Sequence, residues 1–252
     1  MKVAVLAKEV PDLEAQVKVA GGGTSLDIEK RRVLNFFDEI AVEAALKLKE
    51  SAGAETYAVS AGAGVDALRR ALAMGIPGAF HIEDPALADA GPLTVARALA
   101  AFVQKEGFDL VLAGKQATDD EAGLVGPMVA ELLGVPCVVG IVSLEASDGS
   151  VRVSRHTDTG VEVVDLPLPA VVTAEKGLYE PRVPAVTGVM KAMKAKIEKS
   201  SLADLGVEAE PGPKVLGYQP PAKRSAIKMI PGEPAEAASQ LVQLLRDEAK
   251  AL

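Results

Sequence analysis

Short apolar runs alternate with amphipathic stretches over the first half of the chain. Runs of strand length, rich in valine, alanine and leucine, occupy residues 1–7, 55–61, 79–83 and 108–113. Stretches with apolar residues at helical spacing follow them, at residues 38–48, 65–74, 93–104 and 121–133. Strands that alternate with helices of this length are typical of βαβ units with right-handed crossovers. The pattern therefore predicts an α/β fold with a Rossmann-like parallel sheet flanked by helices.

Two smaller features lie between the first strand and the first helix. Gly21–Gly23 predict a tip that joins two short strands. Asn35–Asp38 predict the start of the first helix, with Asp38 as its N-cap because a short acidic side chain can accept a hydrogen bond from a free backbone N–H.

The rhythm changes after Pro136. Three strand-like runs follow one another with short turns between them, at residues 137–145, 150–156 and 161–166, and predict an antiparallel hairpin extension at the edge of the sheet. Residues 170–174 indicate one more buried strand. No strand pattern follows Lys176, where prolines recur until a final helix at residues 236–250. We therefore expect an α/β domain at residues 1–190 and, at residues 191–252, a C-terminal arm and helix that lie on another surface.

Composition and charge narrow the class of protein. Aromatic residues make up 3% and there is no tryptophan, so the core must consist of aliphatic side chains, as in parallel sheets. A net charge of −8 argues against nucleic-acid binding. The single Cys137 excludes an intrachain disulfide and favours a cytoplasmic location. No apolar run reaches roughly 18 residues, so direct membrane insertion is not expected, and a strand pattern that starts at Met1 predicts no signal peptide.

The strongest candidate site is the loop at Gly114–Asp120, between a buried strand and a helix. In open α/β sheets, ligands bind beyond the carboxyl ends of the strands. Gly114 would let the backbone approach a ligand, and N–H groups at the following helix start would face a phosphate. The alternative is an ordinary turn in which Asp119 or Asp120 caps the helix. The residues alone leave both interpretations open.

Two further segments are expected at the same edge of the sheet. Ser60–Gly64 follows a strand but lacks the third glycine of a dinucleotide fingerprint, so it is either a pocket wall or a tight turn. Lys8 follows the first strand and can pair with a carboxylate or a phosphate, or remain a solvated surface lysine.

Catalytic motifs do not occur in the sequence. The two histidines, His81 and His156, belong to no nucleophile or metal motif. Cys137 lies within an apolar strand and is expected in the core. Asp119, Asp120 and Glu121 are adjacent and cannot all face one metal without a looped backbone. We therefore expect neither catalytic residues nor a metal site.

A possible partner surface follows the sheet region. A proline-stiffened loop from Glu180 leads to a helix with basic residues, on which Val186, Val189, Met190 and Met193 predict a compact exposed apolar patch. Such a patch rimmed by charge is typical of a protein-binding surface. The alternative is an amphipathic helix packed on its own core.

Taken together, these segments resemble the beta subunit of electron transfer flavoproteins. The densest agreement is VSRHTDTG at residues 153–160, LPLPAVVT at 166–173, EPR at 180–182 and MKAMK at 190–194. The turn at Lys8–Asp12, the helix start at Asn35–Glu43, the Gly114–Asp120 loop and Asp204–Gly206 agree as well. The resemblance covers most of the chain.

The resemblance implies an electron carrier without catalytic residues of its own. An alpha subunit would hold most of a redox-active FAD, and the beta subunit would hold AMP in a structural role. Electrons would arrive from dehydrogenases, such as those of fatty acid oxidation that act on acyl-CoA, and leave to a membrane quinone oxidoreductase.

The resemblance also implies two sets of site residues. The cofactor-binding set by position is Leu6, Asn35, Phe36, Phe37, Asp38, Ala61, Gly114, Lys115, Gln116, Ala117, Thr118, Asp119, Asp120, Glu121, Ala122, Gly123, Leu124 and Val125, with Phe37 approaching the partner's flavin. The set that recognises dehydrogenases is Arg182, Pro184, Ala185, Val186, Thr187, Val189 and Met190.

Two positions depart from the family pattern. Leu13 stands where some members have an aromatic residue near the flavin. Residues 121–127 are more apolar than in the mitochondrial type and lean toward relatives that bind a second FAD instead of AMP and bifurcate electrons from NADH. AMP is the favoured ligand, and a stand-alone ATP-binding α/β protein is the remaining alternative.

Overall fold

The computed structural model describes residues 1–222 and 227–252, in two units. The first unit, Met1–Gly217, contains the sheet, and the second, Tyr218–Leu252, contains one helix, α6 (Pro234–Asp247). The final helix predicted at residues 236–250 is thus confirmed with shifted bounds. Residues 223–226 of the predicted C-terminal arm lie outside the described residues, and the arm's contact with a partner stays a prediction.

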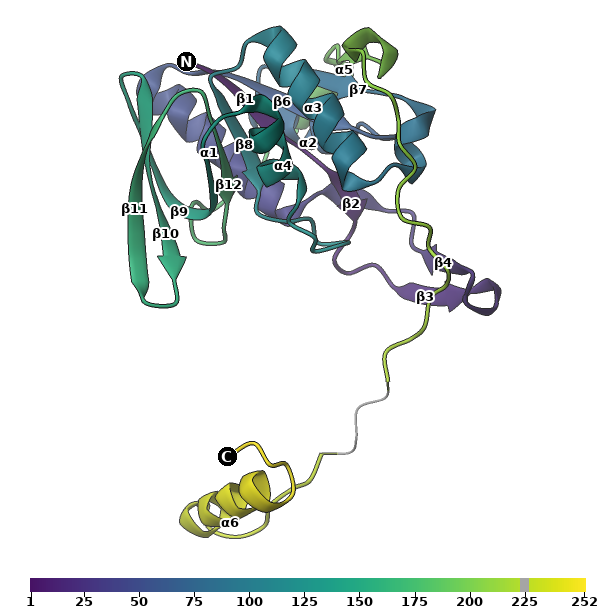
Figure 1. The fold of residues 1–252 in the computed structure, drawn as a ribbon, viewed down its shortest axis with the longest axis vertical. Helices are drawn as coiled ribbons and strands as arrows, with labels where there is room; N and C mark the ends of the chain where they lie inside the picture. Colours follow the sequence, from purple (N-terminus) through teal and green to yellow (C-terminus); the bar gives the residue numbers. More distant parts are fainter. Residues whose placement is uncertain (223–226) are drawn as a thin grey trace. The chain divides into compact units, whose positions relative to one another are not determined.

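A nine-stranded sheet forms the centre of the first unit within the described residues (Figure 1). Its strands, in the order in which they lie across the sheet, are β11 (Gly160–Pro167), β10 (Ser150–Thr157), β9 (Cys137–Ser147), β12 (Ala170–Ala174), β8 (Leu110–Gly114), β1 (Lys2–Leu6), β6 (Glu55–Ala61), β7 (Gly78–Ile82) and β13 (Glu198–Ser200). In this spatial order, each pair of neighbouring strands from β9 through β12, β8, β1, β6 and β7 to β13 is parallel. The β9–β10 and β10–β11 pairs are antiparallel. The predicted parallel sheet with an antiparallel hairpin extension is confirmed.

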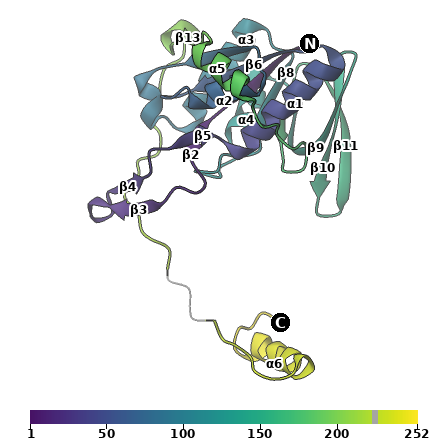
Figure 2. The ribbon, with the colours of Figure 1, turned by 180° about the vertical axis from the view of Figure 1, so that it is seen from behind.

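Helices cover both faces of the parallel strands. On one face lie α1 (Phe36–Ala52), α2 (Asp66–Met74) and α5 (Val186–Lys194), seen in front in Figure 2; on the other lie α3 (Pro92–Glu106) and α4 (Val125–Leu133), in front in Figure 1. Val3 and Val5 of β1 belong to the first core, and Ala4 and Leu6 to the second. Because successive side chains of a strand point to opposite faces, two buried faces require the continuous apolar runs seen in the sequence.

Two small antiparallel sheets lie between β1 and α1 in the chain. β2 (Glu9–Pro11) pairs with β5 (Arg32–Leu34), and β3 (Val17–Ala20) pairs with β4 (Ser25–Ile28). Gly21–Gly23 form the tip of the second hairpin, as predicted, and each has a positive φ.

Three predictions about individual elements are wrong. The helix expected at residues 121–133 begins only at Val125, because Glu121 and Gly123 have φ of 51° and 61°, outside the α region. Asn35 and not Asp38 is the N-cap residue of α1. A strand does follow residue 176: β13 pairs with β7 at the end of the sheet and consists of three polar residues, which form no apolar pattern.

The last part of the first unit lies against α3. Thr94 of α3 and Glu210 exchange hydrogen bonds of 3.2 Å, and Arg97 pairs with the Glu210 carboxylate. A bridge joins Ala90 to Pro211. These contacts fix the chain before Gly217, where the first unit ends. None of the helices within the described residues is both long and apolar enough to cross a bilayer.

Candidate functional site

The carboxyl ends of three neighbouring parallel strands meet at one edge of the sheet. Leu6 ends β1, Ala61 ends β6 and Gly114 ends β8, and β1 lies between the other two. The first turn of α1 and the loop at residues 115–124 are at the same edge. The structure thus brings the predicted cofactor-binding residues together, at the place where open α/β sheets bind ligands. We call this edge the rim.

Asp38 joins three elements at the rim. Its carboxylate accepts hydrogen bonds from the Lys8 N–H at 2.8 Å and from the Gly114 N–H at 2.9 Å, which ties α1 to the ends of β1 and β8. Burial raises the pKa of Asp38 to about 6, although these N–H groups, Asn35 and Lys8 favour the charged form. The side chain predicted as a helix cap is therefore a buried hydrogen-bond acceptor that joins α1 to the ends of two strands.

Gly114 has no room for a side chain. A Cβ there would lie against the Asp38 carboxylate and 2.6 Å from Phe37 Cβ. The close backbone approach that glycine allows is therefore used, in this structure, by the first turn of α1.

Asn35 holds the loop that follows β8. Its Nδ2 donates to the Gln116 carbonyl at 2.9 Å, and its Oδ1 accepts from the Thr118 N–H at 3.1 Å. The side chain is buried, so each of these bonds satisfies a group that water does not reach. One amide side chain thereby sets the path of the loop.

Lys8 neutralises the acidic end of the same loop. Its Nζ lies 2.7 Å from Asp119 Oδ1 and 2.9 Å from Asp120 Oδ2, which confirms the predicted pairing with a carboxylate. Burial works against the charged ammonium, but the two carboxylates raise the net pKa of Lys8. Burial also pushes the pKa of Asp120 upward, and the Ala122 N–H and Lys8 outweigh it, so the pKa is lowered.

The start of α4 offers backbone donors to an anion. The first N–H groups of a helix have no partner within the helix and carry its positive dipole end. Asp120 accepts from the Ala122 N–H, so it closes the preceding turn and does not cap α4. Gly126 lies against Thr173 of β12, where a Cβ would be 2.7 Å from Thr173 Cγ2. Glycine thus seats the helix start close to the sheet.

The start of α2 differs, because the chain itself supplies an anion there. The Glu9 carboxylate accepts from the Asp66 N–H at 2.9 Å and fills the space above Gly64. The Gly62–Gly64 segment is therefore a turn closed by Glu9, although Ala61 remains at the rim.

A cavity of about 390 Å³ adjoins the rim. Apolar and charged side chains line it: Val10, Asp12, Leu13, Arg31, Arg32, Val33, Leu34, Phe36, Glu39, Asp66, Arg70 and Thr118. The rings of Phe36 and Phe37 meet edge to face at 5.2 Å between centroids. Lys115 Nζ lies 5.8 Å from the Phe37 centroid and pairs with Glu175. The Phe37 ring thus lies close to both an aromatic ring and a cation.

The predicted recognition residues form a second, separate region. Pro184, Ala185, Val186, Thr187, Val189 and Met190 lie in α5 and the loop before it. Val186 is 77% exposed and Met190 60% exposed, and Ala192 is the one buried residue of this helix. The helix thus packs on its own core through Ala192, as the alternative expected, while its large apolar side chains stay exposed. The remaining member, Arg182, points inward to Glu43 of α1.

Several residues of these two regions escaped sequence reasoning. Glu9, Glu43 and Glu175 each complete a contact with a part of the chain at least 57 residues away. Glu43 carried a signal in the sequence, since it is a charged residue within the apolar run from Ile40 to Leu46. Its partner could not be read from that signal.

Comparison with known proteins agrees with this architecture. A family model described as the electron transfer flavoprotein domain matches residues 25–205. The chain is 38% identical over 260 residues, covering 100% of both chains, to the electron transfer flavoprotein subunit beta of Bacillus subtilis (strain 168). It is 39% identical to the Sus scrofa and 38% identical to the Homo sapiens proteins of that name, each over 98% of this chain and 97% of the relative. The chain therefore belongs to the electron transfer flavoprotein family, among its beta subunits.

Proposed function

We propose that this electron-transfer subunit binds an AMP in a structural role at the rim formed by β8, β1 and β6. The observation that carries the proposal is the pre-set loop between Gly114 and Val125. Asn35 and Asp38 hold its path, and it ends at the first turn of α4, where Val125 and Gly126 have a backbone N–H and Pro127 has none. A phosphate fits there, because helix N-termini bind anions through main-chain donors.

The alpha subunit is proposed to hold most of a redox-active FAD, which supplies the electron-carrying chemistry when bound. The cavity beside the rim fits contact with such a group, because it combines the Phe36 ring with three arginines, Arg31, Arg32 and Arg70. Phe37 is proposed to approach the flavin. This chain's own role there is to shape the cavity and to limit water, without a catalytic residue.

The exposed apolar side chains of α5 are proposed to bind dehydrogenases such as those acting on acyl-CoA. Val186 and Met193 are 77% and 68% exposed, and Lys191 and Lys194 flank them. An apolar centre rimmed by lysines fits a partner whose apolar pocket is edged by carboxylates. Electrons are proposed to leave to a membrane quinone oxidoreductase, and the protein is proposed to be cytoplasmic.

The C-terminal arm is proposed to clasp the alpha subunit. It includes the second unit, in which Leu241 and Val242 of α6 remain about half exposed. Exposed apolar side chains on a separate helix suit a partner surface.

Nucleotide analysis of the complex tests this proposal. The chain is co-expressed with an alpha subunit, the purified complex is heated, and the released FAD and AMP are counted. One FAD and one AMP per heterodimer are expected. Two FADs without AMP would favour the electron-bifurcating alternative, and a chain that is stable alone and does not bind an alpha subunit would contradict the proposal altogether.

A further inference from the structure

The helix α5 has its small residues inward and its large apolar residues outward. Gly188, Ala192 and Ala195 lie toward α2, whereas the side chains of Val186, Met190 and Met193 are exposed. Burial of glycine and alanine removes little apolar area from water, so it provides little hydrophobic free energy. Contacts other than burial must therefore keep this helix in place.

The contact between α5 and α2 is close. A Cβ on Gly188 would lie 2.7 Å from the Ala73 carbonyl oxygen. This spacing allows the two backbones to be in contact, but glycine contributes no side chain that could pack between residues of α2. The close approach sets the distance between the helices and leaves their orientation to polar contacts.

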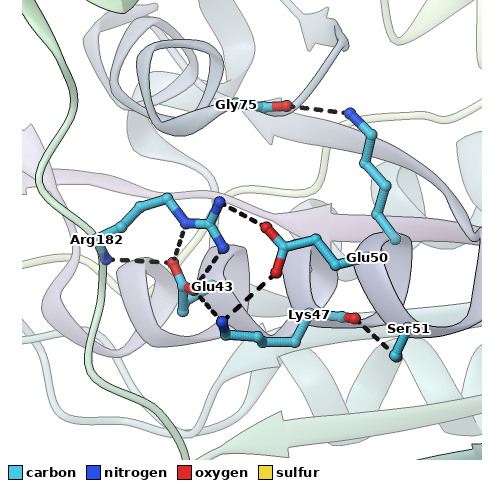
Figure 3. A network of polar contacts seen from close by, with 7 residues as sticks. Glu43, Lys47, Glu50, Ser51, Gly75 and Arg182 are labelled. Atoms are coloured by element: carbon cyan, nitrogen blue, oxygen red, sulfur yellow. Dashed lines mark hydrogen bonds and ion pairs between the residues drawn. The ribbon is translucent and has the colours of Figure 1, made fainter.

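Arg182 fixes the chain before α5 (Figure 3). Its Nε and Nη2 each lie 2.8 Å from an oxygen of Glu43, its backbone N–H donates to Glu43 at 3.2 Å, and its Nη1 lies 2.8 Å from Glu50. Lys47 adds a fourth charge, 3.7 Å from Glu43 and 3.5 Å from Glu50. A bidentate pair of this kind restricts direction as well as distance.

Glu43 is a suitable anchor, because it belongs to the core side of α1. It is 2% exposed, and a buried carboxylate without a cation is costly. Burial would raise the pKa of Glu43, but Arg182 lowers it overall. Removing Arg182 would leave this buried carboxylate without its main cation, and the pair connects the loop before α5 to the helix that begins at the rim.

Arg69 of α2 fixes the other end of α5. Its Nη1 donates to the carbonyl oxygens of Ala192 and Ala195, the second at 2.6 Å. The Ala192 carbonyl already accepts a hydrogen bond from the Ala195 N–H at 3.2 Å, so the arginine is a second donor to Ala192 and links the end of the helix to α2. The helix is thus held at its beginning by α1 and at its end by α2.

We propose that Arg182 and Arg69 are positioning residues, which hold the exposed apolar side chains of α5 in the arrangement that a partner binds. Neither guanidinium has to touch the partner. The inference rests on the proposed recognition role of α5 and adds the reason why an almost fully exposed helix can serve it. A surface ordered before binding loses less conformational entropy when the partner arrives.

The test uses the heterodimer carrying Arg69→Met and Arg182→Met together, because methionine keeps an apolar stem and removes the donors. Amide hydrogen exchange in residues 186–195 should become faster. The KM of a dehydrogenase for the heterodimer should rise roughly tenfold at nearly unchanged kcat, since binding must then also order the helix. The flavin content should stay as in the wild type.

Two further variants test whether a higher KM comes from the loss of order in α5 or from the removal of any arginine. Arg152→Met removes an exposed arginine that pairs with Asp165 in the β10–β11 hairpin, and it should leave the KM and the exchange unchanged. Gly188→Ala, which pushes α5 away from Ala73 with both arginines intact, should raise the KM as well.

The proposal is overturned if the double variant keeps the wild-type KM, or if it loses flavin in proportion to activity. A separate outcome concerns the proposed function. If Val186→Ala leaves the KM unchanged, α5 is not the recognition surface and both ideas fail. If Val186→Ala raises the KM and the double arginine variant does not, only the positioning role of Arg69 and Arg182 is wrong.

Discussion

Asp38 and Gly114 are in direct contact at the rim: the Gly114 N–H donates to Asp38 Oδ1 at 2.9 Å, where no side chain fits on residue 114. The bond joins the end of a central strand to the first turn of α1. Both the loop after β8 and the aromatic pair Phe36–Phe37 take their positions from this junction. Four predictions concern this junction and the exposed helix α5.

Gly114→Ala should destabilise the protein. The added methyl would overlap the Asp38 carboxylate and Phe37 Cβ, and overpacking of this kind costs about 1–3 kcal/mol. Denaturant unfolding of the heterodimer measures the change, and the amount of nucleotide retained should fall with it. Wild-type stability in the variant would contradict the close contact.

Asp38 should give stability a distinct pH dependence. Its pKa rises from 3.8 in the unfolded chain to about 6 in the folded one because of burial. Its contribution is then fully present below pH 3.8 and is lost as the pH rises through about 6, a total of about 3 kcal/mol. The Asp38→Asn variant has no such titration.

Unfolding at pH 4.5 and pH 7.5 checks this sign. The wild type should exceed Asp38→Asn in stability by more at pH 4.5 than at pH 7.5, since other carboxylates cancel in the difference. A difference that does not change with pH would rule out a raised pKa.

Asn35→Ala should loosen the loop after β8. It leaves the Thr118 N–H and the Gln116 carbonyl without their partner, at a cost of about 1–3 kcal/mol. We expect less AMP per purified heterodimer, as counted after heat release. An AMP count equal to that of the wild type would show that the loop is held otherwise.

Val186→Ala should weaken the transfer of electrons from a dehydrogenase and leave the flavin spectrum intact. The loss of two methyl groups that the partner would bury is worth about 1.6 kcal/mol, or roughly a tenfold rise in KM. Val163→Ala is a matched control, because Val163 of β11 is also an exposed valine. Equal effects of the two substitutions would remove the special role of α5.

Much of the fold could be predicted from the spacing of apolar residues along the sequence. The runs at residues 55–61 and 170–174 match β6 and β12 residue for residue, because a strand buried on both faces is mostly apolar. The hairpin extension and the glycine tip at Gly21–Gly23 were equally readable. β13 was not, since its pairing to β7 uses backbone groups and leaves polar side chains outside.

The candidate site was predictable as a place but not as a set of contacts. That Leu6, Ala61 and Gly114 share one edge follows from parallel strands alone. That Asp38 joins α1 to the ends of two strands, that Glu9 closes the start of α2, and that α4 begins at Val125 depended on the local backbone path, which residue type constrains only weakly.

The amino-acid pattern by itself determined the sheet, the helices and the rim, because burial repeats with a period that each element imposes on its own residues. Only the tertiary structure decided which charged side chains pair. Lys8 pairs with Asp119, 111 residues away, and Glu43 pairs with Arg182, 139 residues away. Such pairs form between elements that cross in space, and the direction of a side chain at a crossing depends on packing that no local period records.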